Sequence, residues 1–158
     1  MKHWGMIALL VVLSAVSPSL AFPGDVAIIV SKENLTNEIS FKDLVKIFKL
    51  EKQYWDSGKK IYLVMRETGA IEKEMVLGKI YQMDDVGLKA FWLGKLFRQE
   101  IASFPTTLSS DEAVKRFVSQ VPNAVGFIDA SAVDDRVKIL RIDGKLPMEN
   151  GYKLTDRQ

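Results

Sequence analysis

The residues best suited to bind a ligand lie in one short segment, Arg66 to Ile71, which reads Arg-Glu-Thr-Gly-Ala-Ile. This segment joins a predicted strand, residues 61–65, to a helix that is predicted to begin at Ala70. The free N–H groups and the dipole at the start of a helix favour an anion. The guanidinium of Arg66 has the shape to bind phosphate or carboxylate. We therefore predict a small-anion site made of Arg66, Thr68, Gly69 and the amides of Ala70 and Ile71.

The same segment also has a purely structural interpretation. Joints between a strand and a helix are common, so the pattern by itself is weakly specific. In this interpretation Arg66 forms an ion pair with a nearby acid such as Glu67 or Glu72, and Gly69 only makes the turn. An unpaired Arg66 that faces a concave surface would favour ligand binding, whereas a paired Arg66 would favour the structural role.

Few other side chains in the chain are suited to chemistry. There is no Cys, and the single His is His3. These counts exclude a disulfide, a thiol nucleophile and a Cys/His zinc site. Two acidic pairs, Asp84-Asp85 and Asp134-Asp135, lack partners at metal or catalytic spacing, so we interpret them as a helix start and a turn. We predict no enzymatic activity, no metal and no cofactor.

The first 21 residues have the pattern of a secretory signal peptide. Lys2 and His3 give a positive start, residues 4–16 are apolar, and Ser19 and Ala21 fit the small-x-small cleavage pattern. An apolar run of about 13 residues is shorter than the roughly 20 that cross a bilayer. We expect cleavage after Ala21, a periplasmic location and no stable membrane anchor. The alternative is an uncleaved N-terminal anchor.

The composition is that of one globular domain. The chain has 158 residues, of which 47% are hydrophobic and 27% charged, and its formal net charge of +2 predicts no nucleic-acid partner. Its alternating strands and helices predict an α/β fold with one sheet. The predicted strands are 25–31, 61–65, 125–129 and 137–142, the last at a sheet edge. The predicted helices begin after Ser40, at Ala70, at Asp84-Asp85 and after Ser109 or Ser110.

Three further expectations concern particular segments. The helix that begins at Asp84-Asp85 is expected to turn its apolar residues inward, Leu93 among them. Residues 104–107 are expected to be irregular. The polar, turn-rich residues after Gly144 are expected to form a loose tail.

The order of these segments resembles the phosphate-binding proteins of ABC transporters, within the class II periplasmic solute-binding superfamily. The resemblance extends from about residue 25 to residue 129 and is carried by AIIVSKENLTNEISFKDLVKIF (27–48), Trp55, IYLVMRETG (61–69) and VPNAVGFI (121–128). It implies a single-lobe, periplasmic-binding-protein-like α/β domain, with one mixed sheet flanked by helices, over residues 22–145. The signal peptide, 1–21, would precede this domain and a polar tail, 146–158, would follow it.

The chain also departs from the family pattern. The anion loop keeps Arg66 and Gly69, but the Ser-Gly-Thr that follows in the family is replaced by Ala70-Ile71-Glu72. Glu72 would repel a bound dianion, and a single lobe cannot enclose a small ligand. The resemblance thus implies an exported solute-binding-like protein that binds phosphate or another small anion weakly and works with an ABC permease or another envelope protein. The alternative is a non-catalytic interaction module of the cell envelope that has lost ligand binding.

Overall fold

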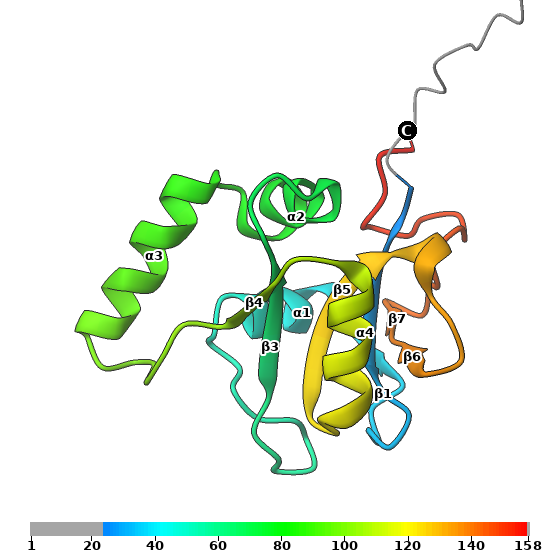
Figure 1. The fold of residues 1–158 in the computed structure, drawn as a ribbon, viewed down its shortest axis with the longest axis horizontal. Helices are drawn as coiled ribbons and strands as arrows, with labels where there is room; N and C mark the ends of the chain where they lie inside the picture. The colour runs from blue at the N-terminus through cyan, green and yellow to red at the C-terminus, as the bar shows by residue number, and fades with distance from the viewer. Residues whose placement is uncertain (1–23, 158) are drawn as a thin grey trace, which may run out of the picture.

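A computed structural model describes residues 24–157, so the predicted signal peptide lies outside the described residues. Figure 1 shows a sheet with helices on its two faces. The elements in chain order are β1 (Val26–Ser31), β2 (Glu38–Ile39), α1 (Phe41–Phe48), β3 (Tyr62–Arg66), α2 (Ile71–Val76), the π-helical turn η1 (Leu77–Tyr81), α3 (Asp85–Phe97), β4 (Thr106–Leu108), α4 (Asp111–Gln120), β5 (Ala124–Asp129), the 3-10 turn η2 (Ala130–Ala132), β6 (Val137–Ile139) and β7 (Arg141–Ile142).

The central sheet is mixed. Its strand order is β4-β3-β5-β1-β6, and β2 pairs with β7 in a separate two-stranded sheet. Strand β3 is parallel to both β4 and β5, whereas β1 is antiparallel to β5 and β6. The predicted fold class, a mixed sheet flanked by helices, is confirmed. The predicted strand 137–142 is divided, because β6 lies at the sheet edge and β7 leaves it to pair with β2.

Each face of the sheet has its own hydrophobic core. Alternate residues of β1 enter the two cores, with Ile28 on the face covered by α1, α2 and α3, and Ile29 on the face covered by α4. Because both faces are covered, β1 is a continuous apolar run rather than an alternating one. This is the physical reason that its sequence identifies it as a buried strand.

Three helices begin where the sequence predicts, each after a side chain that caps its first turn. Ser40, Asp84 and Ser110 precede α1, α3 and α4, and each side-chain oxygen accepts the backbone N–H three residues further on, at 3.0, 2.7 and 3.1 Å. Such a bond satisfies one of the N–H groups that the first helical turn leaves free. Short-range hydrogen bonding therefore fixes where these helices start.

Helix α4 packs directly over a glycine of β5. A Cβ atom on Gly126 would lie 2.7 Å from Cγ1 of Val114 and 3.3 Å from Cγ2 of Val118. Any larger residue would push the helix outward. The glycine thereby sets the position of α4, including its first residue, Asp111.

Two predicted irregular segments are ordered instead. The expectation for residues 104–107 is wrong in part, because Thr106–Leu108 forms β4, which pairs in parallel with β3. The residues after Gly144 are not loose, since Tyr152 and Leu154 are buried. The Tyr152 hydroxyl donates to the carbonyl of Val26 at 2.6 Å, and the Val26 N–H donates to the carbonyl of Leu154 at 2.9 Å. This segment closes the core beside β1.

The structure contains no helix within residues 24–157 that has both the length and the apolar character to cross a membrane.

Candidate anion-binding site

The predicted site lies at the carboxyl ends of two neighbouring strands whose following helices cover opposite faces of the sheet. Strands β3 and β4 are parallel neighbours, and the register pairs Arg66 with Leu108 at their carboxyl ends. After β3 the chain continues into α2 on one face of the sheet, and after β4 it continues into α4 on the other face. In open α/β sheets, ligands bind at such divergence points. The fold thus places Arg66 between the starts of two helices, which is a geometry suited to an anion.

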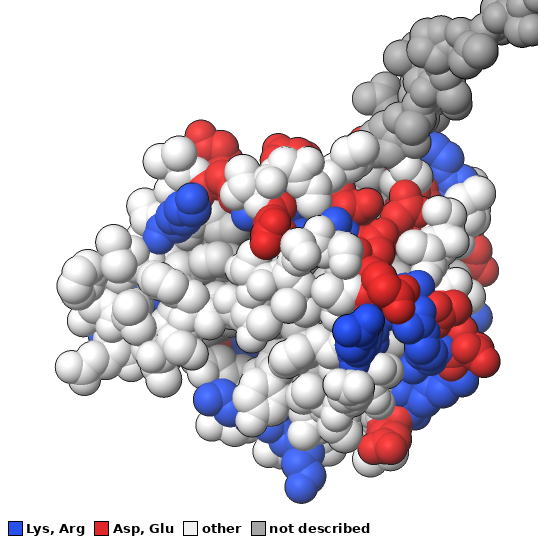
Figure 2. Space-filling view, viewed as in Figure 1, with Lys and Arg blue, Asp and Glu red and all other residues white. Residues whose placement is uncertain are grey.

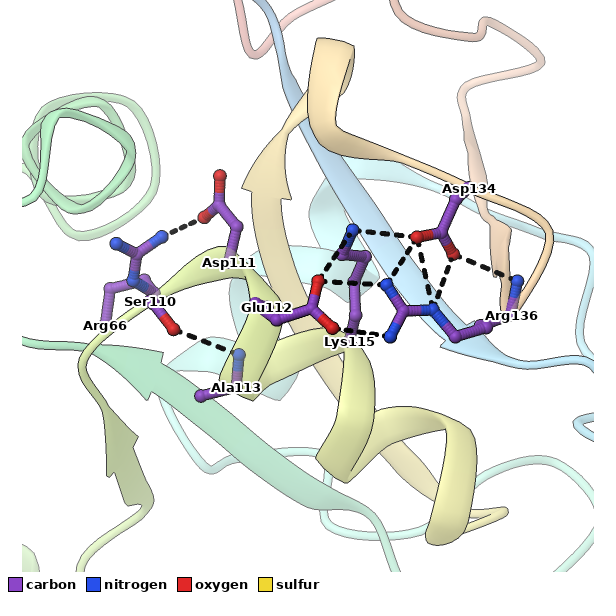
Figure 3. A network of polar contacts seen from close by, with 8 residues as sticks. All are labelled: Arg66, Ser110, Asp111, Glu112, Ala113, Lys115, Asp134 and Arg136. Carbon is purple, nitrogen blue, oxygen red and sulfur yellow. Dashed lines mark hydrogen bonds and ion pairs between the residues drawn. The ribbon is translucent and has the colours of Figure 1, made fainter.

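Arg66 is nevertheless already paired with two carboxylates of the protein. Its side chain is only 10% exposed, and Nη1 donates to Oδ1 of Asp111 (Figure 3). The same nitrogen lies 3.4 Å from Oε2 of Glu72, and Nη2 donates to the carbonyl of Ser109 at 3.4 Å. The buried Nε atom has no partner among the described residues. The positions that an anion would occupy around the guanidinium are therefore taken by carboxylates.

The balance of charge at this site is unfavourable to a further anion. Two carboxylates, those of Glu72 and Asp111, share one guanidinium. Burial raises the pKa of Asp111 and the charge of Glu72 raises it further, although Arg66 acts in the opposite direction. Asp111 thus accepts a proton more readily than an ordinary aspartate, and the site becomes less negative as the pH falls.

Thr68 belongs to a second polar cluster beside the first. Its hydroxyl oxygen accepts from Nζ of Lys73 at 3.3 Å, and the same Nζ lies 2.6 Å from Oδ1 of Asp85. Burial acts to raise the pKa of Asp85, but hydrogen bonds from Lys73 and Thr68 and the charge of Lys73 outweigh it, so that the pKa is lowered. The buried Lys73 is therefore committed to an ion pair.

Of the remaining predicted residues, Gly69 and Ala70 lie in the turn between Arg66 and α2, and Ile71 is the first residue of α2. Gly69 has a φ of 89°, a left-handed conformation that favours glycine. The Ala70 N–H donates to the carbonyl of Glu67 at 3.3 Å, so this amide is used within the turn. The Ile71 side chain is 54% exposed. The five predicted residues thus lie at one strand-to-helix joint, from the end of β3 to the start of α2, but Arg66 and Thr68 engage different partners.

Asp111 is the residue that sequence reasoning missed. The sequence suggests Glu67 or Glu72 as partners of Arg66, and of these two only Glu72 forms an ion pair with it in the described structure. Asp111 lies 45 residues further along the chain. A strand assignment for residues 106–108 would have provided the signal, because it puts the start of α4 beside the end of β3.

Two cavities lie elsewhere in the described residues, and Arg66 lines neither. One, of about 150 Å³, lies between the loops around Gln53 and Phe104. The other, of about 390 Å³, is formed within residues 148–157.

The chain is similar in structure to receptors for phosphate transport. It matches an ABC-type phosphate transport receptor from Vibrio cholerae with a TM-score of 0.64 and 21% identity, over 78% of this chain and 48% of that one. It matches a phosphate ABC transporter substrate-binding protein with bound phosphate from Clostridium perfringens with a TM-score of 0.64 and 20% identity, over 78% and 47% of the two chains. PstS from Borrelia burgdorferi gives a TM-score of 0.59 at 20% identity, over 78% and 49%.

These matches establish the fold of the chain and show how much of each matched structure it corresponds to. The chain spans about half the length of the structures it matches. No family model and no curated protein sequence matches the chain.

Proposed function

We propose that this protein is a solute-binding-like lobe whose anion site is closed by its own carboxylates, so that free phosphate binds weakly at neutral pH. The proposal is supported by the fold shared with phosphate-transport receptors. The observation that carries it is the pairing of Arg66 with Glu72 and Asp111 at the carboxyl ends of the parallel strands.

The electrostatic cost of adding an anion here is large. At about 4 Å and an effective dielectric constant near 20, each pair of unit charges interacts with about 4 kcal/mol. An anion beside Arg66 must overcome repulsion from both carboxylates or displace them from the guanidinium. Solvent screening reduces this cost, because Asp111 is 21% exposed and Glu72 is 16% exposed. Even a reduced cost is enough to weaken binding by a factor of ten or more, since about 1.4 kcal/mol corresponds to tenfold.

Removing the two charges while keeping their shapes tests the proposal. In the Glu72→Gln, Asp111→Asn double variant, phosphate measured by calorimetry should bind at least about tenfold more tightly than in the parent. The parent itself should show no saturable binding with a Kd below about 100 µM. Adding Arg66→Gln to the double variant should abolish the gain, because the cation is then lost.

A matched control uses another acid of α4. Glu112 is exposed and pairs with Lys115 and Arg136 rather than with Arg66, as Figure 3 shows. Glu112→Gln should leave phosphate binding unchanged. Tight phosphate binding by the parent would show that the carboxylates do not close the site. No gain in the double variant would show that Arg66 does not serve an anion site.

The cellular setting belongs to the same proposal. We propose that residues 1–21 direct export to the periplasm and are cleaved after Ala21. The partner proposed there is an ABC permease or another envelope protein, and no enzymatic activity is proposed.

A further inference from the structure

Helix α3 has a second apolar face that the rest of the described chain does not cover. Its inner face packs Leu88 and Trp92 into the core, where they are 1% and 8% exposed. Its outer face carries Val86, Leu93 and Phe97, which are 76%, 44% and 78% exposed. The expectation that Leu93 points inward is therefore wrong. In Figure 1 this helix lies at the margin of the molecule, and Figure 2 shows few charged atoms over it.

The outer residues form a regular seam. Val86, Ala90, Leu93 and Phe97, which we name the α3 seam, are separated by four, three and four residues. This is the a/d spacing of a coiled coil, so all four lie on one narrow stripe. A surface helix needs only one apolar stripe to join its own core. A second stripe with this spacing indicates that another helix packs along it.

The pattern of side-chain sizes favours a second copy of this chain as the source of that helix. In an antiparallel pair with a two-fold axis between Ala90 and Leu93, the small Ala90 faces Leu93 of the other copy. The smaller Val86 likewise faces the larger Phe97. A larger side chain thus faces a smaller one at each contact along the seam. A two-fold interface requires this kind of self-complementarity. The antiparallel arrangement also places the positive end of each helix dipole beside the negative end of the other.

We infer that the α3 seam is the contact of a two-fold, antiparallel dimer of this chain. The inference is independent of the proposed anion site. A helix of 13 residues is about 20 Å long, so the contact is smaller than the roughly 800 Å² per partner of a standard interface. The dimer is accordingly weak, and its population depends on concentration.

Sedimentation velocity on the purified chain, from about 5 to about 300 µM, tests the inference. The mass should rise toward that of two chains as the concentration increases. Leu93→Lys and Phe97→Lys should each raise the dissociation constant at least about tenfold. Thermal unfolding of these variants at low concentration should match the parent, because both side chains are exposed in the single chain.

Leu35→Lys is the matched control. Leu35 is 83% exposed and lies outside the seam, so this variant should dimerise like the parent. A single chain at every concentration would overturn the inference. So would a dimer that both seam variants leave intact, or a loss of dimer in the Leu35 variant as well.

The orientation has its own test, because the chain contains no cysteine. In an antiparallel pair, Val86→Cys in one copy lies opposite Phe97→Cys in the other, within the distance that a disulfide spans. Under mild oxidation, a mixture of the two variants should form the mixed disulfide in preference to either homodimer. Preferential self-linking of Phe97→Cys would instead show a parallel pair and overturn the arrangement.

Discussion

Replacing Arg66 by Met should destabilise the protein at neutral pH and much less at acid pH. The change removes the shared cation and leaves the carboxylates of Glu72 and Asp111 side by side. The three side chains are 10%, 16% and 21% exposed, so water compensates for the lost cation only in part. Met retains much of the length and apolar volume of the Arg stem.

The structure bounds the size of the effect. Breaking a fully buried pair from one side costs about 3–5 kcal/mol. Here the cost is limited because Asp111, whose pKa burial already raises, can be protonated instead. Protonating a carboxyl with a pKa near 4 at about pH 7 costs about 4 kcal/mol, at 1.36 kcal/mol for each pH unit. We therefore expect a loss of about 2–4 kcal/mol at pH 7.

The pH dependence follows from the raised pKa of Asp111. Arg66 acts to lower the pKa of Asp111 in the folded parent, so removing Arg66 raises that pKa further. The folded variant therefore binds a proton at a higher pH than either the folded parent or the unfolded chain. Its loss of stability relative to the parent shrinks as the pH falls from 7 toward the unfolded pKa near 4. Urea unfolding at about pH 7 and about pH 4.5 measures both values. At the lower pH the loss should fall to about 1 kcal/mol.

Two further variants sharpen this measurement. Adding Glu72→Gln and Asp111→Asn to Arg66→Met should recover most of the lost stability, because no unpaired charge remains. Arg136→Met removes an arginine that also bridges two acids, but at an exposed position, so it should cost far less. The reasoning is refuted if Arg66→Met is as mild as Arg136→Met, or if its effect is the same at both pH values.

Two predictions concern the ends of the chain. Leu154 is fully buried, so Leu154→Ala should lower the free energy of unfolding by about 2–5 kcal/mol in urea titrations; a change of less than about 1 kcal/mol would contradict the packing of this segment. The intact mass of protein purified from the exporting cell should correspond to a chain that begins at Phe22, because Ser19 and Ala21 form the predicted cleavage pattern. A mass that still includes residues 1–21 would favour the uncleaved anchor.

The sequence alone determined the features that depend on short-range interactions. Ser40 could be recognised as a cap, and the cap of α4 could be placed at Ser109 or Ser110, because such a side chain bonds to an amide three residues away. The strand at residues 26–31 could be recognised because burial on both faces makes residues 26–30 continuously apolar. The segment 66–71 could likewise be recognised as a strand-to-helix joint, and the order of such segments was enough to give the fold class.

Only the tertiary structure decided what depends on contacts between distant segments. Strand β4 has three residues with exposed or half-exposed side chains, so no pattern marks it, and its pairing with β3 is a matter of backbone hydrogen bonds. Tyr152 and Leu154 are isolated apolar residues whose burial depends on β1, which is more than 120 residues away.

At the candidate site, the sequence predicts the position of Arg66 and the tertiary structure decides its partner. Its sequence neighbours leave open whether it binds an anion or an acid of the protein. The close approach of α4 over Gly126 and the alignment of β4 with β3 bring Asp111 to the guanidinium. Charge interactions fall off with distance and with exposure to water, so the partner of Arg66 is set by spatial proximity, which the linear sequence does not contain.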